Sequence, residues 1–309
     1  MLVLWVIVLL GAVGLGIVSA SRSQTDLART FRASVVARYA AESGIEFARS
    51  RFEGQLLASV EDPAAGDPFH RLASELETTG TQSIGEARFQ VAAVDPASRI
   101  DLNRSSDPLT LGLLEPLFGE RRAASLLATL RDWTDEDDAP REGGAEAAEY
   151  AAAGSPYRPP NRPLRSLDDL PRIRGFTDSI SLALAPFVTV WGDGRVNVNT
   201  APREVLAAVP ALGPDGADAV IAARGADSGI GSKVGLMGAL TQRLERPIGA
   251  QLGSVTTSAD RVLFVSRGWE EGSPLSHEIR AVFEVVRAGA ALGSGTPRLE
   301  LRHWEERLR

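Results

Sequence analysis

The sequence contains no cysteine, only one lysine (Lys233) and only three histidines (His70, His277 and His303) among its 309 residues. Without cysteine the chain has no disulfide, no thiolate ligand for a metal and no thiol nucleophile. The histidines are scattered, and none shows the spacing of a zinc site or the partners of a catalytic triad. These absences favour a protein that is not an enzyme, and we expect no catalytic residues.

Positive charge is also in deficit. The 33 lysine and arginine residues are outnumbered by 40 aspartate and glutamate residues, which gives a formal net charge of −7. Binding to nucleic acid usually requires a clustered basic face, so we expect no nucleic-acid partner. The hydrophobic fraction of 44% and the charged fraction of 24% are ordinary for a globular protein. The length favours two domains over one.

No charged side chain occurs between Leu2 and Val18, within the stretch MLVLWVIVLLGAVGLGIV. A run of about 17–20 apolar residues is long enough to cross the ~30 Å hydrocarbon layer as a helix. A cleaved signal peptide is the alternative, but no basic stretch precedes the run and the helical pattern continues beyond it. We therefore predict that residues 1–21 form a transmembrane segment.

An amphipathic pattern continues this apolar helix. Leu27, Phe31, Val35 and Tyr39 recur every four residues, which predicts a single rod of about 50 residues, or ~75 Å at 1.5 Å per residue. We expect one part of this stripe to cover the protein's own sheet and another part to be a partner interface. A stripe that belongs entirely to the intramolecular core is the alternative, which the pattern alone leaves open.

The rest of the chain has strand patterns at both ends of a helical block. Ala87–Val94 alternates as a strand, and three β-branched or aromatic runs follow near the end, at Arg261–Val265, His277–Val286 and Leu299–His303. The sequence therefore predicts an α+β fold, in which the long helix packs on a small antiparallel sheet and a large helical domain is inserted between its strands. The expected divisions are residues 1–21, 22–99, 100–255 and 256–309.

The helical patterns and the connections between them can be placed more closely. Gly225–Gly235 is expected to be a flexible connection, and GWEEGSP and AGAALGSGTP are expected to join the last strands as hairpins. The expected helices are Phe69–Glu77, Leu109–Phe118, Arg121–Trp133, Ser166–Leu170, Thr177–Leu184, Pro202–Val209 and Ala217–Arg224.

Four motifs occur in a fixed order in the helical block: DWTDEDD, GGAEAAEY, YRPPNRPLRSLDDLPRIRGF and VNVNTAPREVLAAVP. Together with the anchor and the final strands, they resemble the minor pseudopilin K family of type II secretion systems (general secretion pathway protein K). The resemblance covers nearly the whole chain. Two features depart from the family pattern: Ala147 follows Glu146 where an acid is expected, and no basic leader ending in glycine precedes the apolar run.

The resemblance implies a pilin-like fold and a function in protein secretion. It implies a subunit at the tip of the pseudopilus, which promotes pseudopilus assembly for export of folded proteins across the outer membrane. The implied partners are minor pseudopilins I and J, other pseudopilins and, if a leader exists upstream, a prepilin peptidase. The implied location is the inner membrane, crossed once, with the bulk of the chain in the periplasm. A minor pilin of a type IV pilus is an alternative.

The acidic stretch DWTDEDDAPREGGAE could hold a cation. Counted from Asp135 as the first position, Asp137 is third and Glu146 is twelfth, as in the calcium loop of an EF-hand. Pro140 stands at the sixth position, where that loop needs glycine, so the loop is not an EF-hand. A solvated acidic turn is the alternative. The family resemblance favours structural Ca²⁺, and the candidate ligands are Asp135, Asp137, Glu146, Asp138 and Glu142.

Residues 197–224 suggest a rival function as a DNA-binding helix-hairpin-helix in a periplasmic, membrane-anchored DNA-uptake protein. Asn199 or Thr200 is expected to cap the first helix, and Gly213 and Gly216 are expected to form the hairpin. The charges oppose this function. Asp215 and Asp218 lie at the hairpin, and the nearest cations are Arg203 and Arg224. Affinity for nucleic acid rests on several cationic contacts, so we favour a structural helix pair.

The apolar run also lacks an acid. Pseudopilins in general carry a glutamate near the start of this helix, where it pairs with the N-terminal ammonium of an adjoining subunit. Here the first carboxylate is Asp26. A buried carboxylate is costly unless it is paired. A subunit without this acid has no partner to offer the ammonium of a subunit stacked above it, so we expect it only at a filament end.

Overall fold

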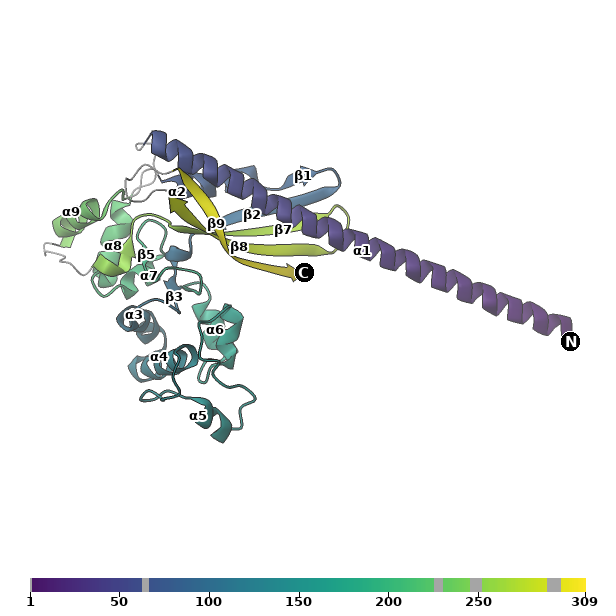
Figure 1. Ribbon diagram of the computed structural model, residues 1–309, viewed down its shortest axis with the longest axis horizontal. Helices are drawn as coiled ribbons and strands as arrows, with labels where there is room; N and C mark the ends of the chain where they lie inside the picture. Colours follow the sequence, from purple (N-terminus) through teal and green to yellow (C-terminus); the bar gives the residue numbers. More distant parts are fainter. Residues whose placement is uncertain (1, 63–66, 225–229, 245–251, 288–295) are drawn as a thin grey trace.

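The computed structural model describes residues 2–62, 67–224, 230–244, 252–287 and 296–309. Helix α1 (Leu2–Glu61) is a single rod of 60 residues, longer than the predicted ~50. Its N-terminal part extends far beyond the rest of the molecule (Figure 1). The first described side chain of α1 that is buried is Ala33.

The structure does not confirm the predicted membrane anchor. None of the helices in the described part of the chain is both long enough and apolar enough to cross a membrane. Within the predicted segment 1–21, the side chains of Val3, Trp5 and Leu10 are described and are exposed, and the other side chains lie outside the described residues.

The predicted α+β fold is confirmed. Five strands form one antiparallel sheet in the order β1-β2-β7-β8-β9. Helix α1 and the shorter α2 (Pro68–Thr79) pack against this sheet. The strands are β1 (Gln82–Ile84), β2 (Ala87–Val94), β7 (Arg261–Glu270), β8 (Ser276–Arg287) and β9 (Pro297–Leu308).

Small residues let α1 lie close to the sheet. A Cβ atom on Gly268 of β7 would lie 2.3 Å from the Ala41 nitrogen and 2.4 Å from the Ala37 oxygen, so only glycine fits there. Gly44 of α1 is also closely packed, because its Cβ would lie 2.1 Å from Ser266 Oγ, although this contact is with a side chain and not with the backbone. The larger side chains of the same interface, such as Phe52, pack beyond this close crossing. The crossing is therefore set by two glycines, one on each element.

The face of α1 that meets the sheet differs from the predicted stripe. Leu27 and Phe31 are each 71% exposed and Tyr39 is 60% exposed, while Val35 is half-buried. Of the four residues only Val35 is partly covered in the single chain, so the alternative in which the whole stripe belongs to the intramolecular core does not hold for Leu27, Phe31 and Tyr39, and their role as a partner interface stays a prediction. A helix turns by about 100° per residue, so a four-residue spacing drifts by about 40° at each step. The residues that do face the sheet are Ala33, Ala37, Ala40, Ala41, Ile45, Ala48, Phe52 and Leu56.

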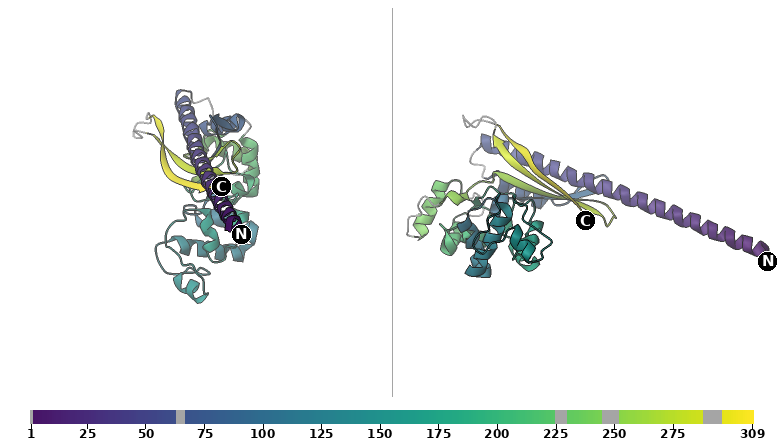
Figure 2. Two further views of the ribbon diagram at one scale, coloured as in Figure 1. Left: turned by 90° about the vertical axis from the view of Figure 1, so that its right-hand side faces the viewer. Right: turned by 60° about the horizontal axis from the view of Figure 1, so that its bottom comes forward.

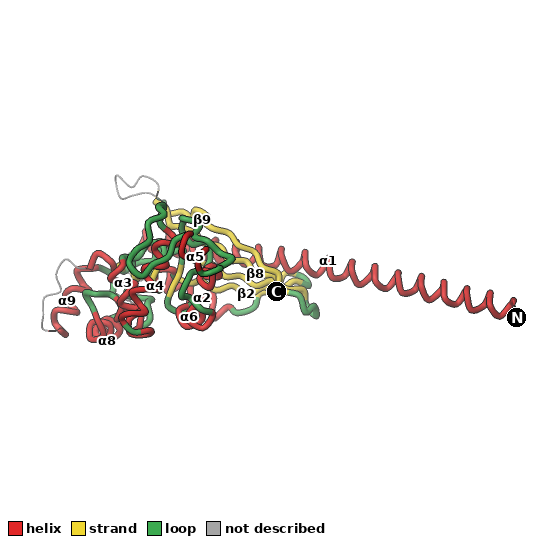
Figure 3. Tube along the Cα trace, turned by 90° about the horizontal axis from the view of Figure 1, so that it is seen from below, coloured by secondary structure: helices red, strands yellow, loops and turns green. Residues whose placement is uncertain are grey.

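The inserted domain lies between β2 and β7. Figures 1 and 2 show it on the opposite side of the sheet from α1. Seen from below in Figure 3, its helices gather at the end of the molecule away from the N terminus. Its α-helices are α3 (Asp107–Phe118), α4 (Glu120–Thr134), α5 (Ala147–Ala152), α6 (Asp178–Leu184), α7 (Arg203–Ala208), α8 (Gly213–Ala223) and α9 (Lys233–Leu244).

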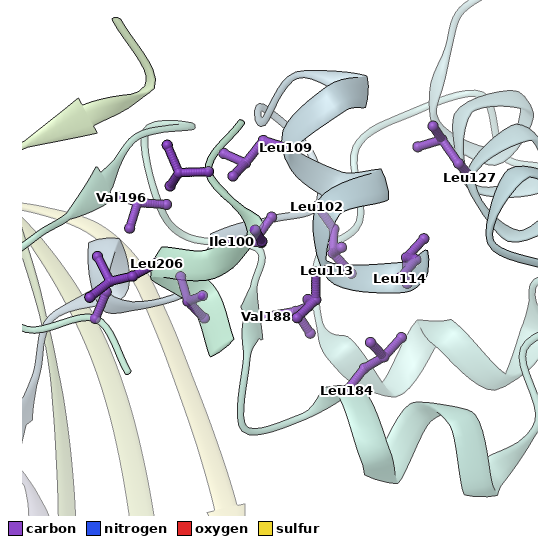
Figure 4. Packing of buried hydrophobic residues seen from close by; sticks show 14 of the residues in the cluster. Ile100, Leu102, Leu109, Leu113, Leu114, Leu127, Leu184, Val188, Val196 and Leu206 are labelled. Atoms are coloured by element: carbon purple, nitrogen blue, oxygen red, sulfur yellow. The ribbon is translucent and has the colours of Figure 1, made fainter. Parts of the chain in front are cut away.

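Short elements tie the inserted domain together. Two parallel pairs join segments that are distant in sequence: β3 (Ile100–Asp101) with β4 (Val188–Thr189), and β5 (Val196–Asn197) with β6 (Val255–Thr256). Three 3₁₀ turns complete it at Pro96–Ser98, Leu167–Arg172 and Leu252–Ser254. Figure 4 shows Leu109 and Leu113 of α3, Val188 of β4 and Leu206 of α7 meeting in its core.

Three local expectations are corrected. Gly213 and Gly216 belong to α8, and the turn before it is Val209–Leu212. Neither Asn199 nor Thr200 caps α7, whose N-cap is Pro202. Helix α9 begins at Lys233, inside the predicted flexible connection. Of the predicted connections, residues 225–229 and 288–295 lie outside the described residues.

Candidate metal centre

The acidic loop runs from the end of α4 to the start of α5, and buried groups hold both of its ends. Trp133 and Tyr150 are buried with ring centroids 5.7 Å apart. Asp132 is fully buried, and its Oδ2 accepts hydrogen bonds from the Ala145 nitrogen at 2.7 Å and the Arg141 nitrogen at 3.3 Å. A Cβ on Gly144 would lie 2.0 Å from this same oxygen. Asp132 therefore fixes the loop through its backbone.

Glu146 is the unusual residue of the loop. It is only 2% exposed, yet neither of its carboxylate oxygens has a hydrogen-bond partner within the described residues. Its backbone nitrogen donates to the Glu149 carboxylate at 2.9 Å. Burial raises the pKa of Glu146 to about 7, and the nearby carboxylates of Asp132, Asp135, Asp138 and Asp137 contribute to the rise. A buried carboxylate without a partner is destabilising, so the Glu146 carboxylate requires either a bound cation or a proton.

Asp135 has a similar environment. Its Oδ1 is buried without a partner in the described chain, and its Oδ2 lies 3.7 Å from Arg141 Nε. Burial raises its pKa, as do the carboxylates of Asp137 and Asp132. Arg141 is shared, because it also lies 3.4 Å from Asp107 Oδ2 and 3.8 Å from Asp132 Oδ1. One exposed guanidinium therefore serves three carboxylates.

Asn161 comes to the loop from a distant segment. Its φ is +48°, a left-handed conformation that asparagine tolerates better than most residues. Its Nδ2 donates to the Asp137 carbonyl at 2.9 Å and to Asp138 Oδ1 at 3.0 Å. Its own Oδ1 is buried and has no partner among the described residues. The sequence offered one signal, since Asn161 lies within the motif YRPPNRP.

The other predicted ligands lie further out. Asp137, Asp138 and Glu142 are exposed, and Asp137 Oδ1 accepts a hydrogen bond from the Ala139 nitrogen at 2.9 Å. Within the described residues, no group of three or more histidine, aspartate or glutamate side chains is placed to hold a metal ion by itself. The loop does have four buried oxygens without partners: Asp135 Oδ1, both oxygens of Glu146, and Asn161 Oδ1. Carboxylate and amide oxygens are the donors that Ca²⁺ prefers.

The helix pair of the rival function has its cations already engaged. Arg203 Nε and Nη2 donate to the two oxygens of Asp218 at 2.6 and 2.8 Å. Arg224 Nη1 donates to three backbone carbonyls, the closest being that of Ala201 at 2.9 Å. Both guanidinium groups are thus engaged within the fold, so the geometry favours a structural helix pair.

Comparison with known proteins gives consistent matches. Residues 87–193 and 196–237 match two models of one family, described as type II secretion system protein K. The type II secretion system protein K of Pseudomonas aeruginosa is 32% identical over 189 residues, which are 56% of this chain and 53% of that protein. The protein K of Klebsiella pneumoniae is 38% identical over 105 residues, or 33% and 32% of the two chains. The matches thus span about a third to a half of these relatives.

The fold has a close counterpart among solved structures. A chain in the crystal structure of the GspK–GspI–GspJ complex from the enterotoxigenic Escherichia coli type 2 secretion system superposes with a TM-score of 0.67. The likeness covers 93% of this chain and 99% of the other, at 17% identity. The inserted domain is therefore similar in sequence to the type II secretion system protein K family, and the whole chain shares its fold with a chain of the solved complex.

Proposed function

We propose that this protein is a minor pseudopilin that caps the tip of the pseudopilus and promotes its assembly for protein export. Its partners are minor pseudopilins I and J of the same system, and it is anchored in the inner membrane by residues 1–21, with the remainder in the periplasm. The observation that carries the proposal is the combination of similarity to the protein K family with a rod, α1, whose first buried described side chain is Ala33. A helix of this kind suits lateral packing with other such helices.

Purification of the full chain in detergent tests this function. The chain is co-produced with minor pseudopilins I and J of its own system, and the mixture is separated by size-exclusion chromatography. We expect one complex that contains all three proteins. Co-production with the major pseudopilin alone is the control, and we expect no stoichiometric complex there. Separate elution of this chain from both I and J contradicts the proposal.

We further propose that the inserted domain binds Ca²⁺ in the acidic loop as a structural ion. Glu146, Asp135 and Asn161 would hold it with their unpartnered oxygens, and the exposed Asp137, Asp138 and Glu142 lie close enough in sequence to complete the shell. The ion would supply the positive charge that one shared arginine does not. The proposal is supported by the burial of Glu146 without a partner.

Thermal melting of the full chain in detergent, in EGTA and in excess calcium, tests the calcium proposal. Ligand linkage predicts stabilisation of ~2.7 kcal/mol when free calcium is 100 times Kd. Burial raises the pKa of Glu146 to about 7. Calcium must therefore displace a proton, and its effect should be larger at about pH 8 than at about pH 6.

A pair of variants makes this test specific. Glu146→Gln should abolish most of the calcium-dependent shift in melting temperature, while Glu120→Gln, which removes an exposed carboxylate from α4, should preserve it. Identical melting of the unsubstituted chain in EGTA and in calcium refutes the proposal. Equal loss of the shift in both variants would show that calcium acts only on general surface charge.

A further inference from the structure

A cleft lies between the inserted domain and the face of the sheet that α1 leaves uncovered. Side chains alternate between the two faces of a strand, and Val262 and Phe264 of β7 pack in the core beneath α1. Arg261 of β7 therefore points to the other face. Val282 of β8 and His303 of β9 are directly paired there, and both line the cleft. The cleft has a volume of about 690 Å³ and is closed on its other side by the inserted domain.

The cleft is strongly basic in an acidic protein. Arg104, Arg165, Arg261 and Arg302 line it, and none of the described residues in its lining is acidic. Arg302 is already paired with Glu284 and Glu300. In contrast, the exposed guanidinium groups of Arg104 and Arg165 form no ion pair or side-chain hydrogen bond with any described residue. Two cations are thus left available at the mouth of the cleft.

Buried nitrogens in the lining are also without partners. Trp191 Nε1, Arg261 Nε and His303 Nε2 are shielded from solvent, and none of them makes a hydrogen bond within the described chain. The rings of Trp191 and His303 lie 5.6 Å apart, and Arg261 is held in place by its Nη1, which donates to the Trp191 carbonyl at 3.2 Å. The indole and guanidinium nitrogens only donate hydrogen bonds, so these sites require an acceptor. A buried donor without an acceptor is destabilising.

We propose that this cleft binds an acidic segment of a partner protein through its carboxylates. Two available cations, together with N–H donors that have no partner, are the groups that recognise a carboxylate. The apolar side chains of Leu164, Val190 and Val282 line the same cleft, so they can cover the aliphatic part of a peptide beside its acidic side chains. Charge complementarity favours an acidic segment over a basic one as the occupant of this cleft. The site is separate from the acidic loop and from α1.

Fluorescence anisotropy with a labelled peptide of alternating leucine and glutamate tests the proposal on the full chain in detergent. Arg165→Glu reverses a cation whose side chain makes no ion pair or hydrogen bond within the described chain, and Arg104→Gln removes the second cation without placing a new negative charge beside the buried Asp101 carboxylate, which Arg104 attracts. A hydrogen-bonded charge contributes enough to affinity that each of these substitutions should weaken peptide binding roughly tenfold or more. Arg121→Glu is the matched control, because it reverses an exposed, unpaired arginine on α4 outside the cleft, and its affinity should stay near that of the unsubstituted chain.

Each alternative result overturns the proposal. Absence of peptide binding to the unsubstituted chain does so directly. Equal weakening by Arg121→Glu would show that the peptide responds to total charge and not to the cleft. If the peptide does not bind, and inorganic phosphate or a single-stranded oligonucleotide binds in an Arg165-dependent way, the cleft is a phosphate site instead. Complex formation with pseudopilins I and J is measured separately, so failure here leaves the proposed function standing.

Discussion

Asp95 lies where the chain leaves β2 and enters the inserted domain, and it links both. Its Oδ2 accepts hydrogen bonds from Asn197 Nδ2 at 2.7 Å and Thr200 Oγ1 at 2.6 Å, and its Oδ1 accepts from the Ala97 nitrogen at 2.8 Å. Asn197 and Thr200 belong to the VNVNTAPRE motif. The motif therefore joins the inserted domain to the sheet, which explains why Thr200 does not cap a helix.

The buried carboxylate of Asp95 predicts a pH-dependent stability. Burial raises its pKa to about 6, although its three hydrogen bonds oppose the rise. Between about pH 4 and about pH 6 the folded state holds a proton that the unfolded state has lost, so stability falls as pH rises through this window. Asp95→Asn does not titrate. The difference in unfolding free energy between the unsubstituted chain and this variant should therefore decrease by about 3 kcal/mol from pH 4 to pH 7.

Calorimetry of the two full-length proteins in detergent, at a series of pH values, measures this difference. The variant also loses part of the hydrogen bonding around residue 95, which shifts the curve by a constant amount. The slope, and not the offset, reports the titration. A difference that does not change between these pH values contradicts the assignment of a raised pKa to Asp95.

At the residue scale, sequence pattern identified the acidic loop but not its inner geometry. Spacing selected Glu146, which the structure buries, Asp135, which it half-buries, and Asp137, Asp138 and Glu142, which it exposes. It missed Asn161, because a residue 15 positions beyond Glu146 reaches the loop only through tertiary folding. Counting along a chain cannot distinguish a carboxylate that points inward from one that points to water.

At the scale of elements, long periodic segments were predicted well. The strand Ala87–Val94 has the predicted bounds, and α3 and α4 each begin within two residues of the expected position. The two parallel pairs were missed because two-residue strands carry no periodicity. Helix α9 was missed because Gly235 and Gly238 weaken its helical pattern. The close crossing of α1 over β7 depends on Gly268, which pattern reading ignores.

The exposed part of the α1 stripe predicts a partner interface. Phe31 is 71% exposed, which is unusual for a large aromatic side chain unless a partner covers it. Phe31→Glu should leave the fold intact and weaken binding to the other pseudopilins by roughly ten- to a hundredfold, from the loss of one buried apolar side chain. Val60→Glu is the control, because Val60 is also an exposed apolar residue of α1 but lies outside the stripe.

Co-purification of each variant with minor pseudopilins I and J measures the effect. The half-buried Val35 gives a second position, at which Val35→Glu should also impair assembly. If Phe31→Glu assembles as well as the unsubstituted chain, this part of α1 is not an interface. If Val60→Glu fails equally, the loss comes from added charge on the helix and not from the stripe.

At the scale of the whole molecule, the inserted domain is a large body on the side of the sheet away from α1 (Figures 1 and 2). We expect a filament of such subunits to pack the long helices side by side. A body of more than 150 residues between β2 and β7 would have to be accommodated on every subunit. One such subunit at an end meets no equivalent neighbour above it, so crowding disfavours a repeating array.

The charge pattern of α1 supports the same placement. The sequence has no aspartate or glutamate before Asp26, so the apolar part of the helix offers no carboxylate to the ammonium of a stacked subunit. An unpaired charge in an apolar helix bundle is costly, so stacking a second copy above this one is unfavourable.

We therefore expect that the full chain, overproduced without its partners, forms no filaments. Electron microscopy of the membranes measures this. Introduction of a glutamate early in the run, as Val6→Glu, removes only the charge defect and leaves the crowding, so it too should give no filaments. Ordered fibres of the unsubstituted chain alone would refute placement at a filament end, and fibres of Val6→Glu only would show that charge, and not the inserted domain, sets the limit.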